Sequence, residues 1–386
     1  MKTIRIYETD SHARRLQARV LSCEEGENGW LVELDRTIFY PTGGGQPCDT
    51  GTLGGADVTE TLLRGETVLH RCTAALPVGA DVTGEIDWAR RLDLMQQHSG
   101  EHLVSGLIHA RFGYENVGFH LGADLVTIDF NGEVDEQALQ ELERAANEAV
   151  WADFAPHIWY PEPDELAHLP YRSKKALTGA VRLVQFGDID LCACCGTHVA
   201  HTGEIGLIKL FSTTHFRGGS RIEMACGGRA LAVLNALCAQ NRDISVRLSA
   251  KPVQTAAAVA RLASERTEAQ QRAAALEDRL FALLAQDGQT LRFEPPMPPE
   301  SVRRLADAMV RANGARCAVF AGQDGAWHYA MADRDGDLRG LTKRLNAALQ
   351  GRGGGKPGFV QGSLAASRTD IEAFFTAESC SMPDPA

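Results

Sequence analysis

Residues 92–106, LDLMQQHSGEHLVSG, decide how we interpret this chain. His98 and His102 stand four positions apart in this stretch, and the apolar residues around them predict a helix from Asp93 to about Phe112. On such a helix both imidazoles leave the same face about one turn apart. That spacing can chelate a single metal ion.

A second pair of metal-binding residues with the same spacing lies in residues 190–203, DLCACCGTHVAHTG. Cys194 and His198 are again four positions apart, and they offer a thiolate and an imidazole. Two matching pairs predict one metal site, formed by His98, His102, Cys194 and His198.

Two alternatives stay open at this point. The histidine pair alone could be two unrelated side chains that share one stripe of a helix. Cys192 and Cys195 are rivals of Cys194 as the thiol ligand. We interpret these two cysteines as small buried hydrophobic residues or as groups behind the ligands.

The chain as a whole is predicted to be an α+β protein. Residues 1–88 alternate short β-like runs with glycine and proline breaks, which predicts a small β-barrel-like domain with a glycine-rich motif. Helical and β-like runs then mix, so we expect an α+β metal-binding domain at 89–240. A helical linker at 241–290 and an α/β domain at 291–386 follow.

The linker carries a heptad pattern. Positions 259, 262, 266, 269, 273, 276, 280 and 283 alternate spacings of three and four, and all but Arg266 are apolar. Such a seam is typical of a coiled coil. It predicts packing against a second copy, giving a homodimer, or against the chain's own domains.

Composition narrows the class of protein. The chain is 44% hydrophobic and 23% charged, and no stretch resembles a signal peptide or a membrane span, so we expect a cytoplasmic protein with no membrane partner. Its ten cysteines then indicate reduced thiols. The net charge of -11 argues against broad capture of nucleic acid. Residues 301–386 hold 11 Lys/Arg against 9 Asp/Glu, so RNA would bind more easily there.

These motifs resemble the editing domain of alanyl-tRNA synthetase and of its free-standing relatives, the AlaX proteins of the long form. The resemblance rests on HSGEH at 98–102 and CCGTH at 194–198, followed by HTGEIGLIKLF and GSRIE. FYPTGGGQPCDTG at 39–51 is similar to the glycine-rich motif of the long AlaX forms. RGGGKPGFVQGS at 352–363 resembles a signature of the synthetase's carboxy-terminal domain, so we expect a related domain at 291–386.

The resemblance spans Asp35 to Ser363 and leaves no room for an aminoacylation domain with its ATP site. AlaX proteins deacylate tRNA(Ala) that carries serine, and in some cases glycine. The resemblance therefore implies a trans-editing hydrolase whose partner is mischarged tRNA(Ala). It also implies one zinc ion per chain, which would activate a water molecule or polarise the substrate.

The resemblance further implies roles for individual residues. Four protein ligands make a closed site, whereas catalysis needs an open position, so we expect His198 to be a weaker ligand or a group behind the ligands. Thr197 and His198 are the implied catalytic residues. The implied substrate-binding residues are Gly43, Gly44, Gly45, Gln46 and Arg221. If the resemblance is set aside, the glycines indicate an ordinary tight turn. Arg221 would then be a charged residue at the end of a strand that forms a salt bridge.

One position departs from the family. Relatives carry a polar side chain 16 or 17 residues after the second histidine, where this chain has Gly118 and Phe119, followed by His120. His120 is a candidate substitute in recognising serine, although a histidine in such a turn is commonly structural.

Two other functions compete with editing. HSGEH also satisfies the HxxEH pattern of zinc peptidases, for which Glu141, Glu143 or Glu148 would supply the third ligand. That interpretation leaves the cysteine cluster and both glycine-rich motifs unexplained. A noncatalytic tRNA-binding module with structural zinc is the other alternative.

Overall fold

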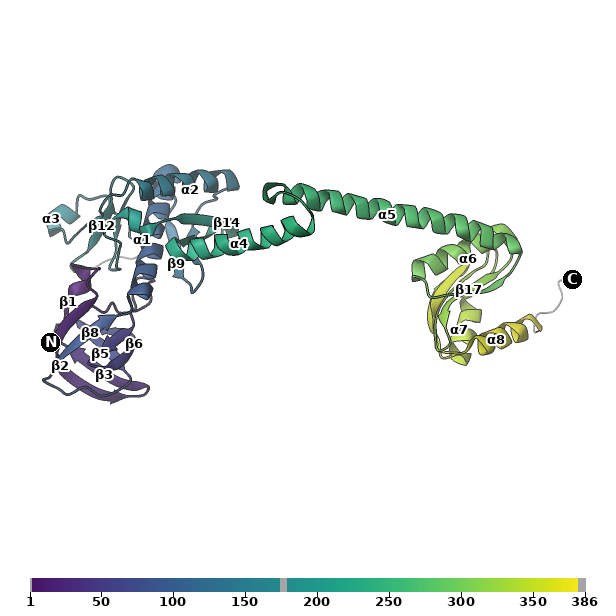
Figure 1. Ribbon diagram of the computed structural model, residues 1–386, viewed down its shortest axis with the longest axis horizontal. Coiled ribbons are helices and arrows are strands. Elements are labelled where there is room, and N and C mark those ends of the chain that lie inside the picture. Colours follow the sequence, from purple (N-terminus) through teal and green to yellow (C-terminus); the bar gives the residue numbers. More distant parts are fainter. Residues whose placement is uncertain (1, 174–178, 381–386) are drawn as a thin grey trace. The chain divides into compact units, whose positions relative to one another are not determined.

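The structure, a computed structural model, describes residues 2–173 and 179–380. It divides the chain into two compact units, Met1–Asp243 and Ile244–Ala386. Helices and strands are mixed in both units (Figure 1), which confirms the predicted α+β class. None of the described helices combines the length and apolar character that crossing a membrane requires.

Unit 1 begins with a closed barrel of strand order β2-β3-β7-β6-β5-β8, in which each neighbouring pair is antiparallel. Side chains alternate between the two faces of a strand, so Val32 and Leu34 of β3 both point into the core and are fully buried. The elements of this part are β1 (Ile4–Arg5), η1 (Ile6–Glu8), β2 (Arg15–Gly26), β3 (Gly29–Leu34), β4 (Arg36–Thr37), β5 (Gly51–Leu53), β6 (Ala56–Arg64), β7 (Thr67–Cys72) and β8 (Asp81–Ile86).

Helix α1, Trp88–Phe112, leads from the barrel into the metal-binding part of unit 1 (Figure 1). It starts five residues before the predicted Asp93, because the Asp87 side chain accepts a hydrogen bond from the Arg90 backbone N–H and caps the first turn. The helix ends as predicted at Phe112, where Gly113 adopts the left-handed conformation of a C-terminal cap.

One hydrophobic core holds α1, α2 and the sheet of order β14-β15-β10-β9 together. A smaller sheet, β11-β12-β13, presents the cysteine cluster at the end of β13. The elements here are β9 (Asn116–Leu121), β10 (Val126–Phe130), α2 (Glu136–Trp151), β11 (His157–Trp159), α3 (Pro163–Leu166), β12 (Leu183–Phe186), β13 (Asp190–Ala193), η2 (Thr202–Ile205), β14 (Ile208–Phe216), β15 (Gly219–Cys226) and α4 (Gly227–Arg247).

Unit 2 contains a sheet of order β16-β17-β18-β20-β19. The α/β character predicted for 291–386 is wrong for most of this sheet, because β16–β17 is the one parallel pair among its described strands and the other three pairs are antiparallel. Asp324 and Gly325 form a two-residue turn between β17 and β18, and a hairpin makes its strands antiparallel. The elements are η3 (Pro252–Gln254), α5 (Thr255–Leu284), η4 (Ala285–Asp287), β16 (Leu291–Glu294), α6 (Pro299–Asn313), β17 (Cys317–Gln323), β18 (Ala326–Ala332), α7 (Arg339–Ala348), β19 (Arg352–Lys356), β20 (Phe359–Leu364) and α8 (Arg368–Cys380).

The heptad seam lies on α5. Its large apolar side chains are 49–65% exposed, whereas Phe281, outside the seam, is buried in the core with α6. Unit 2 therefore leaves the seam uncovered by its own core. The boundaries of the four predicted domains stay predictions.

Candidate metal centre

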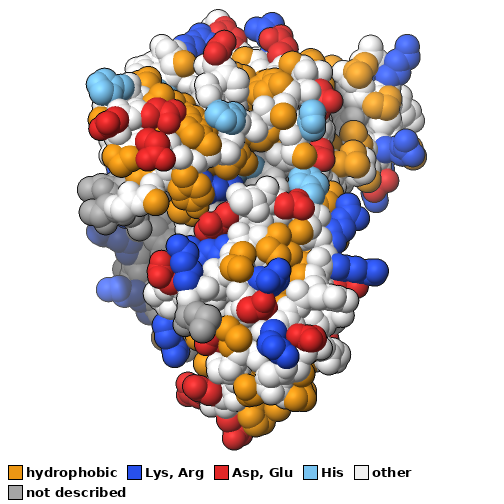
Figure 2. Space-filling view, turned by 90° about the vertical axis from the view of Figure 1, so that its left-hand side faces the viewer, with side chains coloured by type: hydrophobic (Ala, Val, Ile, Leu, Met, Phe, Trp, Pro, Cys, Tyr) orange, Lys and Arg blue, Asp and Glu red, His pale blue; other side chains and the backbone are white. Residues whose placement is uncertain are grey.

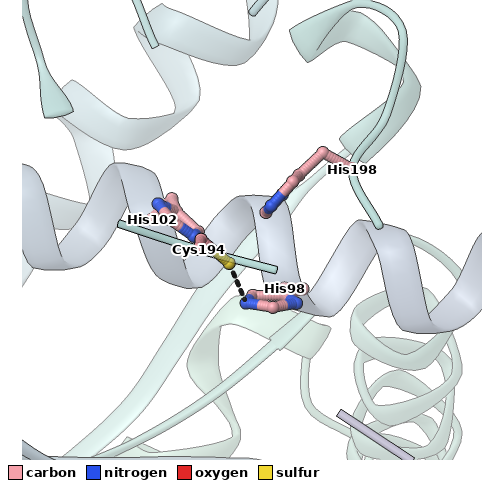
Figure 3. A group of neighbouring side chains, drawn as sticks. All are labelled: His98, His102, Cys194 and His198. Carbon is pink, nitrogen blue, oxygen red and sulfur yellow. Dashed lines mark hydrogen bonds between the residues drawn. The ribbon is translucent and has the colours of Figure 1, made fainter. Parts of the chain in front are cut away.

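Four possible metal ligands meet in unit 1 (Figure 3). His98 and His102 project from α1, and Cys194 and His198 come from the loop after β13. Their ligand atoms all lie within 4.8 Å of one another, and Nε2 of His98 is 3.4 Å from Sγ of Cys194. The three histidines are 0–2% exposed, whereas Cys194 is partly exposed. The structure thus brings the two predicted pairs together.

The ligand loop is fixed by its glycine and by a buried arginine. A Cβ atom at Gly196 would lie 2.2 Å from Cε1 of His98, so only glycine lets the loop approach the helix this closely. Arg182 donates to the carbonyl oxygens of Cys194 and Gly196 at 3.0 and 2.9 Å. These contacts place Cys194 and His198 on either side of a bend at Gly196 that lies against α1.

Each histidine has a different partner on its Nδ1 side. For His98 the partner is Oε1 of Gln46 at 2.8 Å, and for His102 it is the carboxylate of Asp190 at 2.7 Å. His198 has a longer contact, 3.4 Å to Oγ of Ser99. Partners of this kind orient a metal-binding imidazole and set its tautomer. His198 is therefore the least firmly held of the three.

The charges of the cluster suit a metal ligand set. Burial would raise the pKa of the Cys194 thiol, but the nearby His98 and His198 and a hydrogen bond from His102 hold that pKa well below its usual value. Burial lowers the pKa of His198 to about 3. A thiolate beside a neutral imidazole is the state in which these groups bind metal ions.

The two rival cysteines, Cys192 and Cys195, do not have a lowered thiol pKa. Burial raises the pKa of the Cys192 and Cys195 thiols. Cys192 is buried and belongs to a second possible metal-binding group with His102 and Asp190, whereas Cys195 is exposed and outside both groups found among the described residues. Cys194 is the thiol whose surroundings favour metal binding.

One buried atom points to an ion. Nε2 of His198 is buried and has no hydrogen-bond partner in the part of the chain that the structure describes. Buried polar atoms without partners are rare in native proteins, and a bound ion is one accepted explanation. The donor set of three imidazoles and one thiolate matches the ligands that zinc prefers. The residues present therefore fit zinc.

The glycine-rich turn of the barrel reaches this centre. Gly43 and Gln46 exchange backbone hydrogen bonds of 3.1 and 2.9 Å, and Gln46 donates through Nε2 to Oγ1 of Thr197 at 2.8 Å. Gly45 faces Phe119, whose ring stacks on His98 with centroids 5.5 Å apart. Of the predicted site residues, Gln46 and Thr197 thus lie against the ligands. The Phe119 ring separates Gly45 from His98.

Arg221 and His120, two further residues predicted to contact substrate, are not among the metal ligands or their hydrogen-bond partners. Arg221 of β15 donates to both carboxylate oxygens of Asp129 at 2.6 and 2.8 Å, and it stacks over Phe216. His120 is exposed on β9. Their roles toward a substrate stay predictions.

The helix α2 does not supply a third ligand of the peptidase type. Glu141 pairs with Arg111, and Glu143 with Lys209. Neither of them, nor Glu148, belongs to a metal-binding group among the described residues. Glu101, the glutamate of HxxEH, accepts hydrogen bonds from Ser105 and Asn116.

Three residues that support the metal ligands were not predicted from the sequence. Asp190 stands in the quoted cysteine motif, four residues before Cys194, and a carboxylate beside metal ligands could have been noticed there. Arg182 and Ser99 gave no signal, because their roles depend on chain segments that only the fold brings together.

Two protein-family models match parts of this chain. Residues 181–223 match "Threonyl and Alanyl tRNA synthetase second additional domain", and residues 7–90 match "tRNA synthetases class II (A)". The first stretch contains Cys194 and His198, and the second contains Gln46.

Similar proteins include the "Alanyl-tRNA editing protein AlaX-L" of Pyrococcus horikoshii, which is 32% identical over 241 residues covering 60% of each chain. The "Alanyl-tRNA editing protein Aarsd1" of Danio rerio is 26% identical over 94% of this chain and 95% of its own length. An "Alanine--tRNA ligase" of Pyrococcus abyssi is 29% identical over 94% of this chain but only 42% of its own length. The match thus spans less than two thirds of AlaX-L and of the ligase. The solved C-Ala domain of Aquifex aeolicus alanyl-tRNA synthetase is 18% identical, covers 23% of this chain and 87% of its own, and has a TM-score of 0.21.

Proposed function

We propose that the chain is an alanyl-tRNA editing protein of the AlaX type and that it hydrolyses mischarged tRNA(Ala), releasing serine or glycine without using ATP. The single observation that carries the proposal is the buried cluster of His98, His102, Cys194 and His198 in a chain related to editing proteins along nearly its whole length.

Zinc is the proposed cofactor, with one ion per chain. His98, His102 and Cys194 would hold it most firmly, because their surroundings orient the two imidazoles and favour the thiolate. The orphaned Nε2 supports His198 as the fourth ligand, and its long contact to Ser99 supports it as the ligand that yields to substrate. When bound, zinc would polarise the ester or lower the pKa of a water molecule.

The groups next to the ligands would receive the aminoacyl ester. Thr197 precedes His198 on the ligand loop, directly beside the proposed zinc ligands, so we assign this pair to the reacting end of the substrate. Gly43, Gly44 and Gly45 would form the wall of the aminoacyl pocket opposite Phe119. Because the Phe119 ring packs closely against Gly45, a pocket at this place would be narrow and would favour a small side chain such as that of glycine or serine.

Recognition of tRNA must depend on local contacts, because the net charge is -11. Figure 2 shows acidic and basic side chains interspersed over one face, without a continuous basic surface. We assign tRNA(Ala) binding to unit 1 around the metal centre and to the carboxy-terminal domain, whose residues 301–386 carry a small excess of basic side chains. The exposed seam of α5 supports a homodimer.

Deacylation of purified Ser-tRNA(Ala), Gly-tRNA(Ala) and Ala-tRNA(Ala) tests the proposal. We expect the zinc-loaded chain to release serine or glycine and to spare alanine. A zinc-loaded chain that binds tRNA(Ala) but leaves every ester intact would identify a noncatalytic module instead. Hydrolysis of peptides that stops on adding a chelator would identify a peptidase.

A further inference from the structure

Gln46 links the barrel to the metal centre. It lies in the glycine-rich turn between β4 and β5 and is 1% exposed. Its Oε1 contacts Nδ1 of His98 at 2.8 Å and the backbone N of Thr197 at 3.2 Å. Its Nε2 lies 2.8 Å from Oγ1 of Thr197. One side chain thus touches both halves of the ligand set, the helix and the loop.

These contacts fix which atoms carry hydrogen. The Thr197 backbone N–H can only donate, so the amide atom that faces it must be oxygen. The same oxygen faces Nδ1 of His98, which must therefore be protonated and donate to it. The lone pair of the His98 imidazole is then on Nε2, the nitrogen that lies 3.4 Å from Sγ of Cys194. Gln46 thereby selects the tautomer in which His98 can bind a metal ion through Nε2.

The supporting contact comes from a different part of the fold than the ligands do. Asp190, which supports His102, precedes the ligand loop on β13, and Ser99, which contacts His198, is on α1 itself. Gln46 is carried by the barrel, 52 positions before His98. Movement of the glycine-rich turn would therefore change the position of a metal ligand directly.

We propose that Gln46 is a positioning residue of the metal centre, which holds the tautomer and orientation of His98 and ties the ligand loop to it. The inference rests on the proposed zinc site. It makes the barrel a required part of that site, because the ligands alone do not contain the acceptor that His98 needs.

Two substitutions test this role. Gln46→Met keeps the approximate volume but removes both amide functions, and Gln46→Glu keeps an acceptor for His98 and Thr197. We expect Gln46→Met to bind zinc about 10- to 100-fold more weakly, the usual effect of losing a partner behind a ligand. Gln46→Glu should retain zinc affinity much closer to that of the native chain. Zinc affinity would be measured by competition with a chromophoric chelator, and ligand geometry by the visible absorption spectrum of the Co²⁺ form.

Gln97→Met is the matched control. Gln97 is a fully buried glutamine on α1 whose amide bonds the backbone N–H and carbonyl of Cys226 rather than a ligand. This variant should lose stability while keeping the Co²⁺ spectrum and zinc affinity.

The role is overturned if the native chain binds zinc and Gln46→Met has the same affinity and Co²⁺ spectrum. It is also overturned if Gln46→Glu loses as much affinity as Gln46→Met. A native chain that binds no zinc would instead remove the proposed function on which the inference depends.

Discussion

The carboxylate of Asp190 lies 2.7 Å from Nδ1 of His102, with both side chains at most 2% exposed. Arg172 donates to the other carboxylate oxygen at 2.8 Å. Although burial alone would lower it, the hydrogen bonds to Asp190 and to the Cys194 thiolate raise the pKa of His102 to about 10. The buried chain Arg172–Asp190–His102 therefore orients one ligand of the metal centre and increases its basicity.

Asp190→Asn should weaken zinc binding by about 10- to 100-fold, because the neutral amide no longer polarises His102 and leaves Arg172 without a counter-charge. Chelator competition measures the effect. Asp188→Asn, at an exposed position of the turn before β13, serves as the control and should bind zinc like the native chain. Equal zinc affinity in the Asp190 and Asp188 variants would contradict the assigned role.

Gly45→Ala should reduce deacylation about tenfold or more, since each 1.4 kcal/mol of misfit costs a factor of ten. Gly45 has φ +84, and an added Cβ would lie 2.5 Å from Cδ1 of Phe119. Gly44→Ala is the control, because Gly44 also has a positive φ but meets only the Tyr40 hydroxyl at 3.9 Å. We expect kcat/KM to fall further for Gly45→Ala than for Gly44→Ala, with zinc content unchanged. Equal kcat/KM in the two variants would contradict the importance of the close approach between Gly45 and Phe119.

His70 should make the barrel sensitive to acid. Its Nε2 contacts the Thr37 hydroxyl and its Nδ1 the carbonyl of Val32, and burial lowers its pKa from 6.5 to about 4. Between these two values the unfolded chain binds the proton and the native chain does not, so stability falls as pH decreases. At pH 5 the loss relative to pH 7 is about 2 kcal/mol.

Urea unfolding of the native chain and of His70→Gln at both pH values checks this contribution. The variant should be less stable at pH 7 but should lack the part of the pH dependence that His70 contributes. An identical pH dependence in both proteins would show that His70 is not the responsible group.

Arg91 and Asp49 join α1 to the barrel through an ion pair with both side chains 0% exposed. Arg91→Met should lower the free energy of unfolding by about 3–5 kcal/mol, because it leaves the Asp49 charge buried without its partner. Arg15→Met, which removes an exposed pair with Glu85 on the same barrel, should cost less than about 1 kcal/mol. Urea unfolding measures both, and similar losses would contradict the importance of burial.

The ligand pairs could be predicted from the sequence because each one is local. Residues four apart on a helix share a face whatever the tertiary structure, so His98 and His102 required only that Asp93–Phe112 be helical. The hairpin of β17 and β18 is also specified locally, because Asp324 and Gly325 form its two-residue turn.

The supports of the ligands could not be predicted, because they depend on contacts between distant segments. Gln46 meets His98 only because the barrel packs beside α1, and Ser11 reaches the carbonyl of His198 across 187 positions. The glycine-rich motif alone did not distinguish a group that contacts substrate from one that holds a ligand. The strand order in unit 2 could not be predicted, because the amphipathic pattern of a strand does not specify its neighbours in the sheet.

The most direct test of the central claim is to measure zinc content and deacylation of Ser-tRNA(Ala) and Gly-tRNA(Ala) together, for the native chain, Cys194→Ala and Cys195→Ala. We predict that the native chain and Cys195→Ala contain zinc and release serine or glycine, whereas Cys194→Ala loses both zinc and activity. Zinc-loaded native protein that leaves both mischarged tRNAs intact, or Cys194→Ala with full zinc and full activity, would contradict the account.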